Sequence, residues 1–210
     1  MKRQKTMREK AAVAAICGLF LVAFCAESSA QTAKQVLDKT AAALTSKGGA
    51  SASFAVKDSG GSALSGTIWF KGSMFKVVSS QLKIWFDGTT QWTYMSATDE
   101  VNITEPTPAQ QQMLNPYKLI TSYKDGYETS IASKGNSYVV TLKAQSANKA
   151  IQEARITVDK SSYHPSDLQV KQNGAWTAIS VSNVQAASIA DNLFVFDPKE
   201  CPGAEIIDLR

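Results

Sequence analysis

The sequence has few of the residues that build metal centres and covalent scaffolds. It contains one histidine, His164, and three cysteines. Only Cys201 lies beyond the first thirty residues, so no disulfide can form within that larger part of the chain. One histidine and one cysteine also cannot supply a histidine-based metal cluster. The sequence therefore excludes a small scaffold stapled by disulfides, and burial alone must stabilise the fold.

Motifs of the common enzyme classes are missing as well. The chain has no Gly-x-Ser-x-Gly nucleophile elbow, no phosphate-binding loop and no dinucleotide fingerprint. Asp99 and Glu100 are adjacent carboxylates, but neighbouring strand residues point to opposite faces and make a poor acid–base pair. We therefore expect a protein that is not an enzyme and that uses no cofactor and no metal.

The first thirty residues have the three-part pattern of a secretory signal peptide. Five bases precede an uncharged run from Ala11 to Ala26, which is shorter than the roughly 20 apolar residues that span a bilayer. Ser28 and Ala30 place small residues before a cleavage site, so cleavage is predicted after Ala30. An uncleaved anchor helix and lipid attachment at Cys17 or Cys25 are the alternatives.

Removal of this segment takes away most of the net positive charge. The segment holds five of the 22 Lys and Arg residues and two of the 18 Asp and Glu residues, so the remainder has a net charge near +1. The basic character of the full chain is thus no argument for a nucleic-acid partner.

Residues 31–210 have the length of one domain with a sizeable core. Apolar residues at three- and four-residue spacing, among them Val36, Leu37 and Leu44, predict one longer helix over Thr32–Ser46. Thr32 is its predicted cap, and the glycines after Lys47 end it.

Short runs rich in Val, Ile, Thr and aromatic residues follow this helix. They predict eleven strands, and turn pairs such as Asp87-Gly88 and Asn173-Gly174 join them. Because helical crossovers between most strands are missing, we expect a mainly β fold with an antiparallel meander. The predicted strands are Ser51–Lys57, Ala63–Lys71, Met74–Ser79, Leu82–Phe86, Thr90–Ser96, Val101–Thr104, Tyr127–Ser133, Ser137–Leu142, Ile151–Val158, Asp167–Lys171 and Thr177–Val184.

A helical insert interrupts the meander. Prolines at 106 and 108 break the sixth strand, and short helices are predicted over Ala109–Leu114 and Tyr117–Tyr123. With the first helix they would form a lid on an unclosed barrel. The predicted lid residues are Val36, Leu37, Leu44, Met113, Leu114, Tyr117, Leu119 and Ile120.

Seven aromatic side chains between positions 69 and 94 fall on four successive predicted strands. Period-two alternation divides them between two faces of the sheet. Either they fill an ordinary sandwich core, or they line a cavity beneath the lid. The residues assigned to this cavity are Ile68, Phe70, Phe75, Val77, Ile84, Phe86, Trp92 and Tyr94. Trp69 and Trp85 are assigned to the outer face, where they would form a partner-docking patch.

Several segments carry a resemblance to a known family. In chain order they are Gly66-Thr67-Ile68-Trp69-Phe70-Lys71, Phe86-Asp87-Gly88-Thr89-Thr90-Gln91-Trp92-Thr93-Tyr94, Asn115-Pro116-Tyr117 and Phe194-Val195-Phe196-Asp197-Pro198. Residues 31–210 are similar over almost their whole length to the periplasmic outer-membrane lipoprotein carrier family (LolA-like). The ending, Pro202–Arg210, resembles members of the Bacteroides type.

The resemblance implies a single half-barrel domain that acts in the periplasm as a monomer. It implies that an apolar cavity shields the acyl chains of lipoproteins, which arrive from an inner-membrane release complex and pass to an outer-membrane acceptor. Better-known members carry an Arg-Pro pair after the second strand, and that arginine latches the lid. Gly72-Ser73 occupies these positions here, so Lys71 or another base would have to substitute, or the lid is looser. A periplasmic lipid-sensing or regulatory module with the same fold is the alternative, and an enzyme acting on lipid or glycan is the least favoured.

Overall fold

The structure is a computed structural model of the chain. It describes residues 31–210 with the exception of 59–62, 109 and 112–114. The predicted signal peptide lies outside the described residues, so its cleavage stays a prediction. Among the described helices, none combines the length and the apolar character that crossing a membrane requires.

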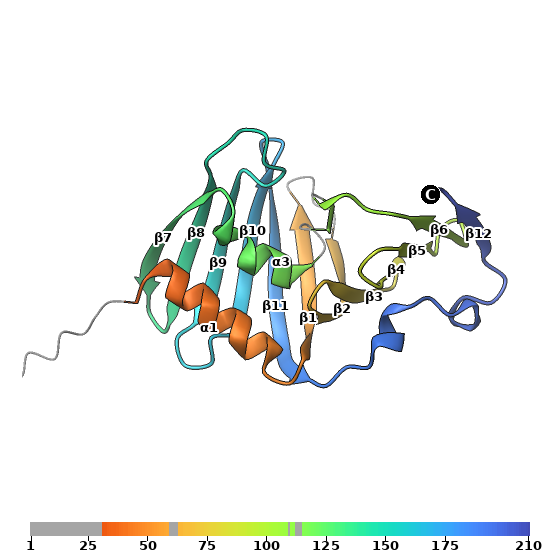
Figure 1. Cartoon of the computed structure of the whole chain (residues 1–210), viewed down its shortest axis with the longest axis horizontal. Coiled ribbons are helices and arrows are strands. Elements are labelled where there is room, and N and C mark those ends of the chain that lie inside the picture. Colours follow the sequence, from red (N-terminus) through yellow and green to blue (C-terminus); the bar gives the residue numbers. More distant parts are fainter. Residues whose placement is uncertain (1–30, 59–62, 109, 112–114) are drawn as a thin grey trace, which may run out of the picture. The chain divides into compact units, whose positions relative to one another are not determined.

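A sheet of twelve strands dominates the described part of the chain (Figure 1). Its strand order is β12-β6-β5-β4-β3-β2-β1-β11-β10-β9-β8-β7, and the two end strands differ, so the sheet is not closed. All neighbours are antiparallel except β12 and β6, which are parallel. The strands are β1 Gly49–Asp58, β2 Ala63–Lys71, β3 Met74–Ser79, β4 Leu82–Phe86, β5 Gln91–Met95, β6 Glu100–Thr104, β7 Tyr127–Lys134, β8 Ser137–Ala144, β9 Glu153–Asp159, β10 Pro165–Gln172, β11 Ala175–Ala187 and β12 Glu205–Asp208.

The predicted fold class, a mainly β unclosed sheet with an N-terminal helix and a short inserted helix, is confirmed. Eleven strands are where the sequence predicts them, to within a few residues. The twelfth, β12, was not predicted. It has four residues and pairs in parallel with β6, about a hundred positions earlier in the chain. A strand this short has no alternation long enough to recognise.

The first helix, α1, spans Ala33–Thr45 and begins at a capping box. The Thr32 hydroxyl accepts a hydrogen bond from the Gln35 backbone N–H (3.2 Å), and the Gln35 side chain accepts one from the Thr32 N–H (2.9 Å). Gly48, with φ of 92°, lets the chain turn back into β1. One side of α1 packs against β1, β7, β8 and β11.

The inserted helix that the structure describes is α3, Pro116–Thr121, which is followed by a short 3₁₀ turn, Ser122–Lys124. It packs against α1, and Figure 1 shows both helices on the same face of the sheet. We call this face the inner face, and we call α1 and α3 together the lid. The other predicted short helix, Ala109–Leu114, falls mostly on positions outside the described residues.

A bulge bends β11 beneath the lid. The pairing of β11 with β1 shifts between Ser51, opposite Gln185, and Ser53, opposite Ser182, so β11 carries an extra residue. Asn183 takes the left-handed conformation there (φ 51°), and its side-chain amide donates to the Ser53 hydroxyl (3.2 Å). Such bulges increase the local bend and twist of a strand.

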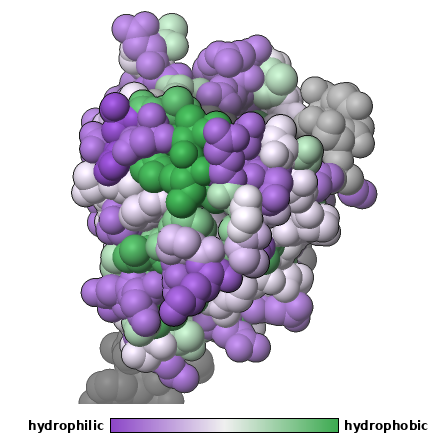
Figure 2. All heavy atoms as spheres, turned by 90° about the vertical axis from the view of Figure 1, so that its right-hand side faces the viewer, coloured by the Kyte–Doolittle hydropathy of each residue, from purple (hydrophilic) through white to green (hydrophobic). Residues whose placement is uncertain are grey.

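After β11 the chain crosses to the outer face. Residues 188–204, which we call the C-terminal strap, connect β11 with β12 and include two 3₁₀ turns, Asp191–Phe194 and Pro198–Glu200. Beyond the strap, Ile206 and Leu209 are 51% and 62% exposed. Figure 2 views the side that carries β12 and shows apolar surface bordered by hydrophilic side chains.

Candidate functional site

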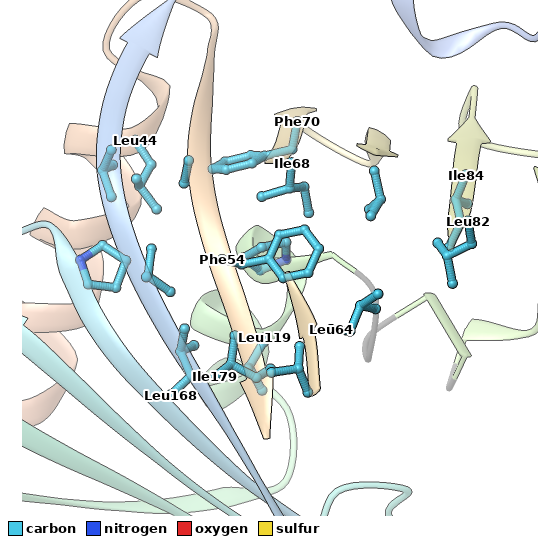
Figure 3. A pocket seen from close by; sticks show the side chains of 17 residues that line it. Leu44, Phe54, Leu64, Ile68, Phe70, Leu82, Ile84, Leu119, Leu168 and Ile179 are labelled. Carbon is cyan, nitrogen blue, oxygen red and sulfur yellow. The ribbon is translucent and has the colours of Figure 1, made fainter. Parts of the chain in front are cut away.

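An apolar cavity of about 210 Å³ lies between the lid and the inner face (Figure 3). Every one of the 17 described side chains that line it is aliphatic, aromatic or proline, so these residues offer no charge and no side-chain hydrogen bond. The lining residues are Leu44, Ala52, Phe54, Val56, Leu64, Ile68, Phe70, Val77, Leu82, Ile84, Pro116, Leu119, Pro165, Leu168, Ile179, Val181 and Val184.

Strand alternation explains most of this wall. On β1, every second residue from Ala52 to Val56 lines the cavity, and β11 contributes Ile179 and Val181 in the same way. The bulge at Asn183 resets the alternation, so Val184 also faces inward although it lies three positions after Val181.

A glycine makes room for the largest side chain of the β1 wall. Gly66 of β2 pairs with Phe54 of β1. A Cβ atom at position 66 would lie 3.1 Å from the Phe54 ring and only 2.1 Å from the Val78 carbonyl oxygen. No real side chain tolerates that approach, so the glycine lets the strands and the ring pack closely.

The lid is joined to the sheet by a buried asparagine. Asn115 caps α3: its side-chain oxygen accepts from the backbone N–H groups of Tyr117 (2.9 Å) and Lys118 (3.3 Å). Its side-chain amide donates to the carbonyl oxygens of Gly72 and Ser73, both at 3.0 Å. The residue is fully buried. One side chain thus fixes the start of α3 to the turn between β2 and β3.

The turn that Asn115 contacts is the one where the resembled family carries its latch arginine. Lys71 does not take that role, because its ammonium pairs with Asp191 (2.7 Å) and donates to the Ile189 carbonyl (3.2 Å), both in the strap. The connection between lid and turn therefore runs from an asparagine side chain on the lid to backbone carbonyls of the turn.

Four of the eight predicted cavity residues line the cavity: Ile68, Phe70, Val77 and Ile84. Two more, Phe75 and Phe86, are fully buried in the same core, with ring centroids 5.1 Å apart, but they do not line the cavity. These two rings pack against each other in the core on β3 and β4.

The placement of Trp92 and Tyr94 on the inner face is wrong. Trp92 pairs with Trp85, and Thr93 pairs with Ile84, so Trp92 and Tyr94 share the outer face with Trp85. Both pack in a second cluster around Trp85, Val101 and Cys201. The error came from the length of the turn. The predicted strands left three residues between them, 87–89, whereas the loop has four, 87–90, and is closed by a hydrogen bond from the Asp87 N–H to the Thr90 carbonyl. One extra residue moves every side chain of the following strand to the other face.

Of the predicted lid residues, Val36, Leu37, Leu44, Leu119 and Ile120 are buried in the core beneath the helices. Leu44 and Leu119 reach the cavity wall. Tyr117 is half-buried and packs against the same core. Met113 and Leu114 lie outside the described residues.

Trp69 and Trp85 lie on the outer face as predicted, on either side of Lys76. Trp69 is half-buried, but Trp85 is completely covered by the strap, whose Phe196 ring lies edge-on at 5.1 Å. Trp85 is therefore not an exposed docking residue in this conformation. A role of the two rings in partner docking stays a prediction.

The cavity residues contributed by β1, β10 and β11 were not predicted from the sequence. Phe54, Leu168, Ile179 and Val181 all lie on predicted strands and alternate with small or polar residues, so the signal was present. The aromatic-rich strands contribute only part of the wall, and β1, β10 and β11 contribute the opposite part.

The lid carries several titratable groups, but no titratable group among the described residues lines the cavity. Tyr123, which follows α3, donates to the Asp38 carboxylate of α1. Burial, together with this hydrogen bond and the nearby negative charge, raises the pKa of Tyr123 to about 12. The bond ties the two lid helices together, and nothing in it suggests acid–base chemistry.

Together these features define a class of protein: a half-closed β-sheet whose inner face and helical lid enclose an apolar container. The sequence model of the family described as outer membrane lipoprotein carrier protein LolA matches residues 22–174. The chain belongs to this family.

Comparisons with curated proteins and with solved structures gave the following results. A search of curated proteins found no match. An uncharacterized conserved protein from Thermus thermophilus superposes with a TM-score of 0.56 at 9% identity, covering 84% of this chain and 98% of that one. A LolA superfamily protein from Nitrosomonas europaea reaches 0.47 at 12% identity, covering 80% and 99%. A putative outer membrane lipoprotein-sorting protein domain from Vibrio parahaemolyticus reaches 0.45 at 11%, covering 77% and 95%.

Proposed function

We propose that this chain is a periplasmic carrier that shields the acyl chains of lipoproteins, or of similar amphiphiles, and transfers them toward the outer membrane. The observation that supports this most strongly is the wholly apolar wall of the cavity under the lid. A wall whose described side chains are all apolar favours hydrocarbon and leaves the peptide or headgroup of a cargo outside.

The energetics suit such a cargo. Moving hydrocarbon from water into an apolar site recovers about 0.8 kcal/mol per methylene, so an acyl chain of ordinary length gains several kcal/mol without any specific contact. Water in the same space would find no hydrogen-bond partner among the lining side chains.

The cavity volume implies that the lid moves during loading. A dry apolar cavity of about 150 Å³ takes up a benzene-sized molecule. The space here, about 210 Å³, therefore admits part of one acyl chain. Loading of a whole chain or of several chains requires α1 and α3 to separate from the inner face.

The proposal also covers how the chain is exported, which partners it meets and which family members it is most similar to. The chain is secreted by a signal peptide cleaved after Ala30 and acts in the periplasm as a monomer, without a cofactor. It receives cargo from an inner-membrane release complex and delivers it to an outer-membrane acceptor, as family membership suggests. Its similarity to Bacteroides-type members rests on the ending Pro202–Arg210.

Competition between a triacylated lipopeptide and an apolar fluorescent dye tests this function. Val181→Phe places a ring into the cavity, and we expect it to weaken lipopeptide binding about tenfold, or about 1.4 kcal/mol. Ser182→Phe is the matched control, because Ser182 is exposed on the next position of the same strand.

Thermal unfolding of both variants shows whether overpacking, which costs about 1–3 kcal/mol in a filled core, has disturbed the fold. Equal lipopeptide affinity in Val181→Phe, Ser182→Phe and the wild type, with all three folded, would contradict the proposal.

A further inference from the structure

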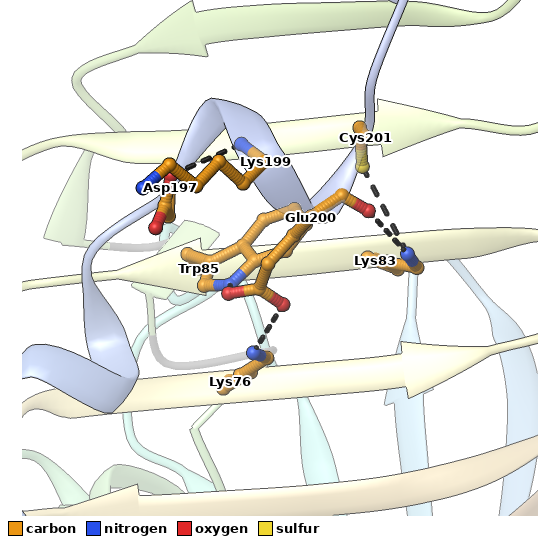
Figure 4. Close-up of polar contacts among 7 residues, drawn as sticks. All are labelled: Lys76, Lys83, Trp85, Asp197, Lys199, Glu200 and Cys201. Atoms are coloured by element: carbon orange, nitrogen blue, oxygen red, sulfur yellow. Dashed lines mark hydrogen bonds and ion pairs between the residues drawn. The ribbon is translucent and has the colours of Figure 1, made fainter.

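The outer face of the sheet carries a carboxylate-binding cradle that the protein fills with its own strap (Figure 4). The Glu200 side chain uses both oxygens: one pairs with the Lys76 ammonium at 2.7 Å, and the other accepts from the Trp85 indole N–H at 3.2 Å. The Lys83 ammonium donates to the Glu200 backbone carbonyl at 3.0 Å. Three side chains on two adjacent strands thus converge on one glutamate.

The cradle requires a negative charge. Lys76 is only 7% exposed, and its ammonium lies 5.2 Å from the centre of the Trp85 ring. A buried ammonium without a partner is strongly unfavourable, so this site favours an occupant with a carboxylate. Lys71 and Lys83 add positive charge on either side of it, and Lys71 also holds an acidic strap residue, Asp191.

Aromatic contacts complete the cradle. The Phe196 ring of the strap packs edge-on against Trp85, and Cys201 and Ala204 pack in the same cluster with Trp92 and Tyr94. The strap thus presents to the cradle an aromatic residue, Phe196, and four positions later a glutamate, Glu200.

The strap is held in a way that permits exchange. In the part of the chain that the structure describes, residues 188–204 belong to no strand of the sheet, so their release breaks no ladder hydrogen bond. Val195 remains 44% exposed, whereas Phe194 is fully buried. The family match at residues 22–174 includes every sheet residue of the cradle and ends before the strap.

We propose that the cradle is a docking site for an acidic, aromatic-containing segment of a partner protein and that the strap covers it in the isolated chain. The surface is separate from the lipid cavity, so this inference does not depend on the carrier function. A partner segment must compete with a tethered one, which acts at a millimolar effective concentration.

A peptide with the sequence of residues 194–203, with serine in place of the cysteine, is the probe. In the full chain, Glu200→Ala weakens the strap, and we expect the peptide to bind this variant at least about tenfold more tightly than it binds the wild type. Labelling of Cys201 by a thiol reagent, followed by peptide mass spectrometry, should become faster in the variant and faster again with bound peptide.

Three controls decide the result. The same peptide with alanine in place of its glutamate should bind the Glu200→Ala variant about tenfold more weakly. Adding Lys76→Met to Glu200→Ala should abolish the increase in peptide affinity. Glu205→Ala removes an exposed acid of β12 outside the cradle and should leave peptide binding at the wild-type level. If Glu200→Ala fails to fold by circular dichroism, Glu200→Gln replaces it.

Two outcomes overturn the proposal. In one, the peptide binds the folded Glu200 variant no better than the wild type, or binds equally with and without Lys76. In the other, light scattering shows that the chain dimerises with Cys201 protected from labelling, which would assign the cradle to the strap of a second copy.

Discussion

Asp159 illustrates how one residue shapes the turn that leads into the cavity wall. Its carboxylate accepts from the hydroxyl groups of Ser161 (2.6 Å) and Ser162 (3.0 Å) and from their backbone N–H groups (3.0 and 2.8 Å). The turn returns the chain to β10, which carries Pro165 and Leu168 of the cavity wall. Chiefly the Ser161 hydroxyl, helped by the Ser162 donors, holds the pKa of the Asp159 carboxyl well below its usual range.

This shift predicts a pH dependence of stability with a definite sign. Because the folded-state pKa is depressed, the stabilisation is present above the unfolded-state value of about 3.9 and is lost as the pH falls toward the folded-state value. Asp159→Asn should therefore be less stable than the wild type at pH 7, with the difference shrinking below pH 4. Urea unfolding between pH 3 and pH 7 measures this, and a difference that is constant across the range would contradict it.

Cys201 shows the opposite kind of shift. Burial, as the main cause, raises the pKa of its thiol, although Lys83 nearby acts the other way. The thiolate is the reactive form, so the docked strap should protect Cys201 from alkylation at neutral pH. This protection makes Cys201 a reporter of strap position.

Among the elements, the link between α3 and the β2–β3 turn has the clearest consequence for lid movement. Asn115→Asp keeps an oxygen that can cap α3 but loses both bonds to the carbonyl groups of Gly72 and Ser73. We expect a loss of about 2 kcal/mol in the local stability of the lid, because two buried carbonyl groups lose their partner and a charge faces them. Amide hydrogen exchange of Leu119 and Ile120 should accelerate more than that of the β8–β9 core.

The matched control is Thr45→Val, which removes a side-chain bond at the other end of the lid, from the Thr45 hydroxyl to the Ala41 carbonyl (2.8 Å). It should leave exchange in α3 unchanged. Unchanged exchange of α3 in Asn115→Asp would show that the asparagine does not restrain the lid.

The elements also show how far the sequence predicts this fold. Alternation within a strand correctly assigned Ile68, Phe70, Val77 and Ile84 to one face, because the two-residue period is a local property. It could not relate Trp92 to Phe86, because the relation between neighbouring strands depends on the length of their turn. The β12 pairing and the Asn115 link involve residues far apart in the chain, and local patterns carry no information about them.

At the scale of the whole molecule, the two faces of the sheet have different coverings. The inner face and the lid enclose an apolar cavity, whereas the outer face presents lysines and tryptophans that the strap covers. The missing motifs led only to the expectation of a protein that is not an enzyme, and the resemblance indicated its family. The cavity could not be predicted from the sequence, because a filled core and a core with a cavity have the same pattern of apolar residues along the strands.

If this chain carries lipoproteins, acyl chains occupy the space between the lid and the inner face. A lipopeptide with a photoreactive diazirine on one acyl chain, crosslinked to the full chain and mapped by peptide mass spectrometry, would show where the acyl chain lies. We expect crosslinks to cavity residues such as Phe54, Leu119 and Ile179, and their loss in Val181→Phe. Crosslinks confined to the strap and β12, or none with excess lipopeptide on a folded chain, would contradict this expectation.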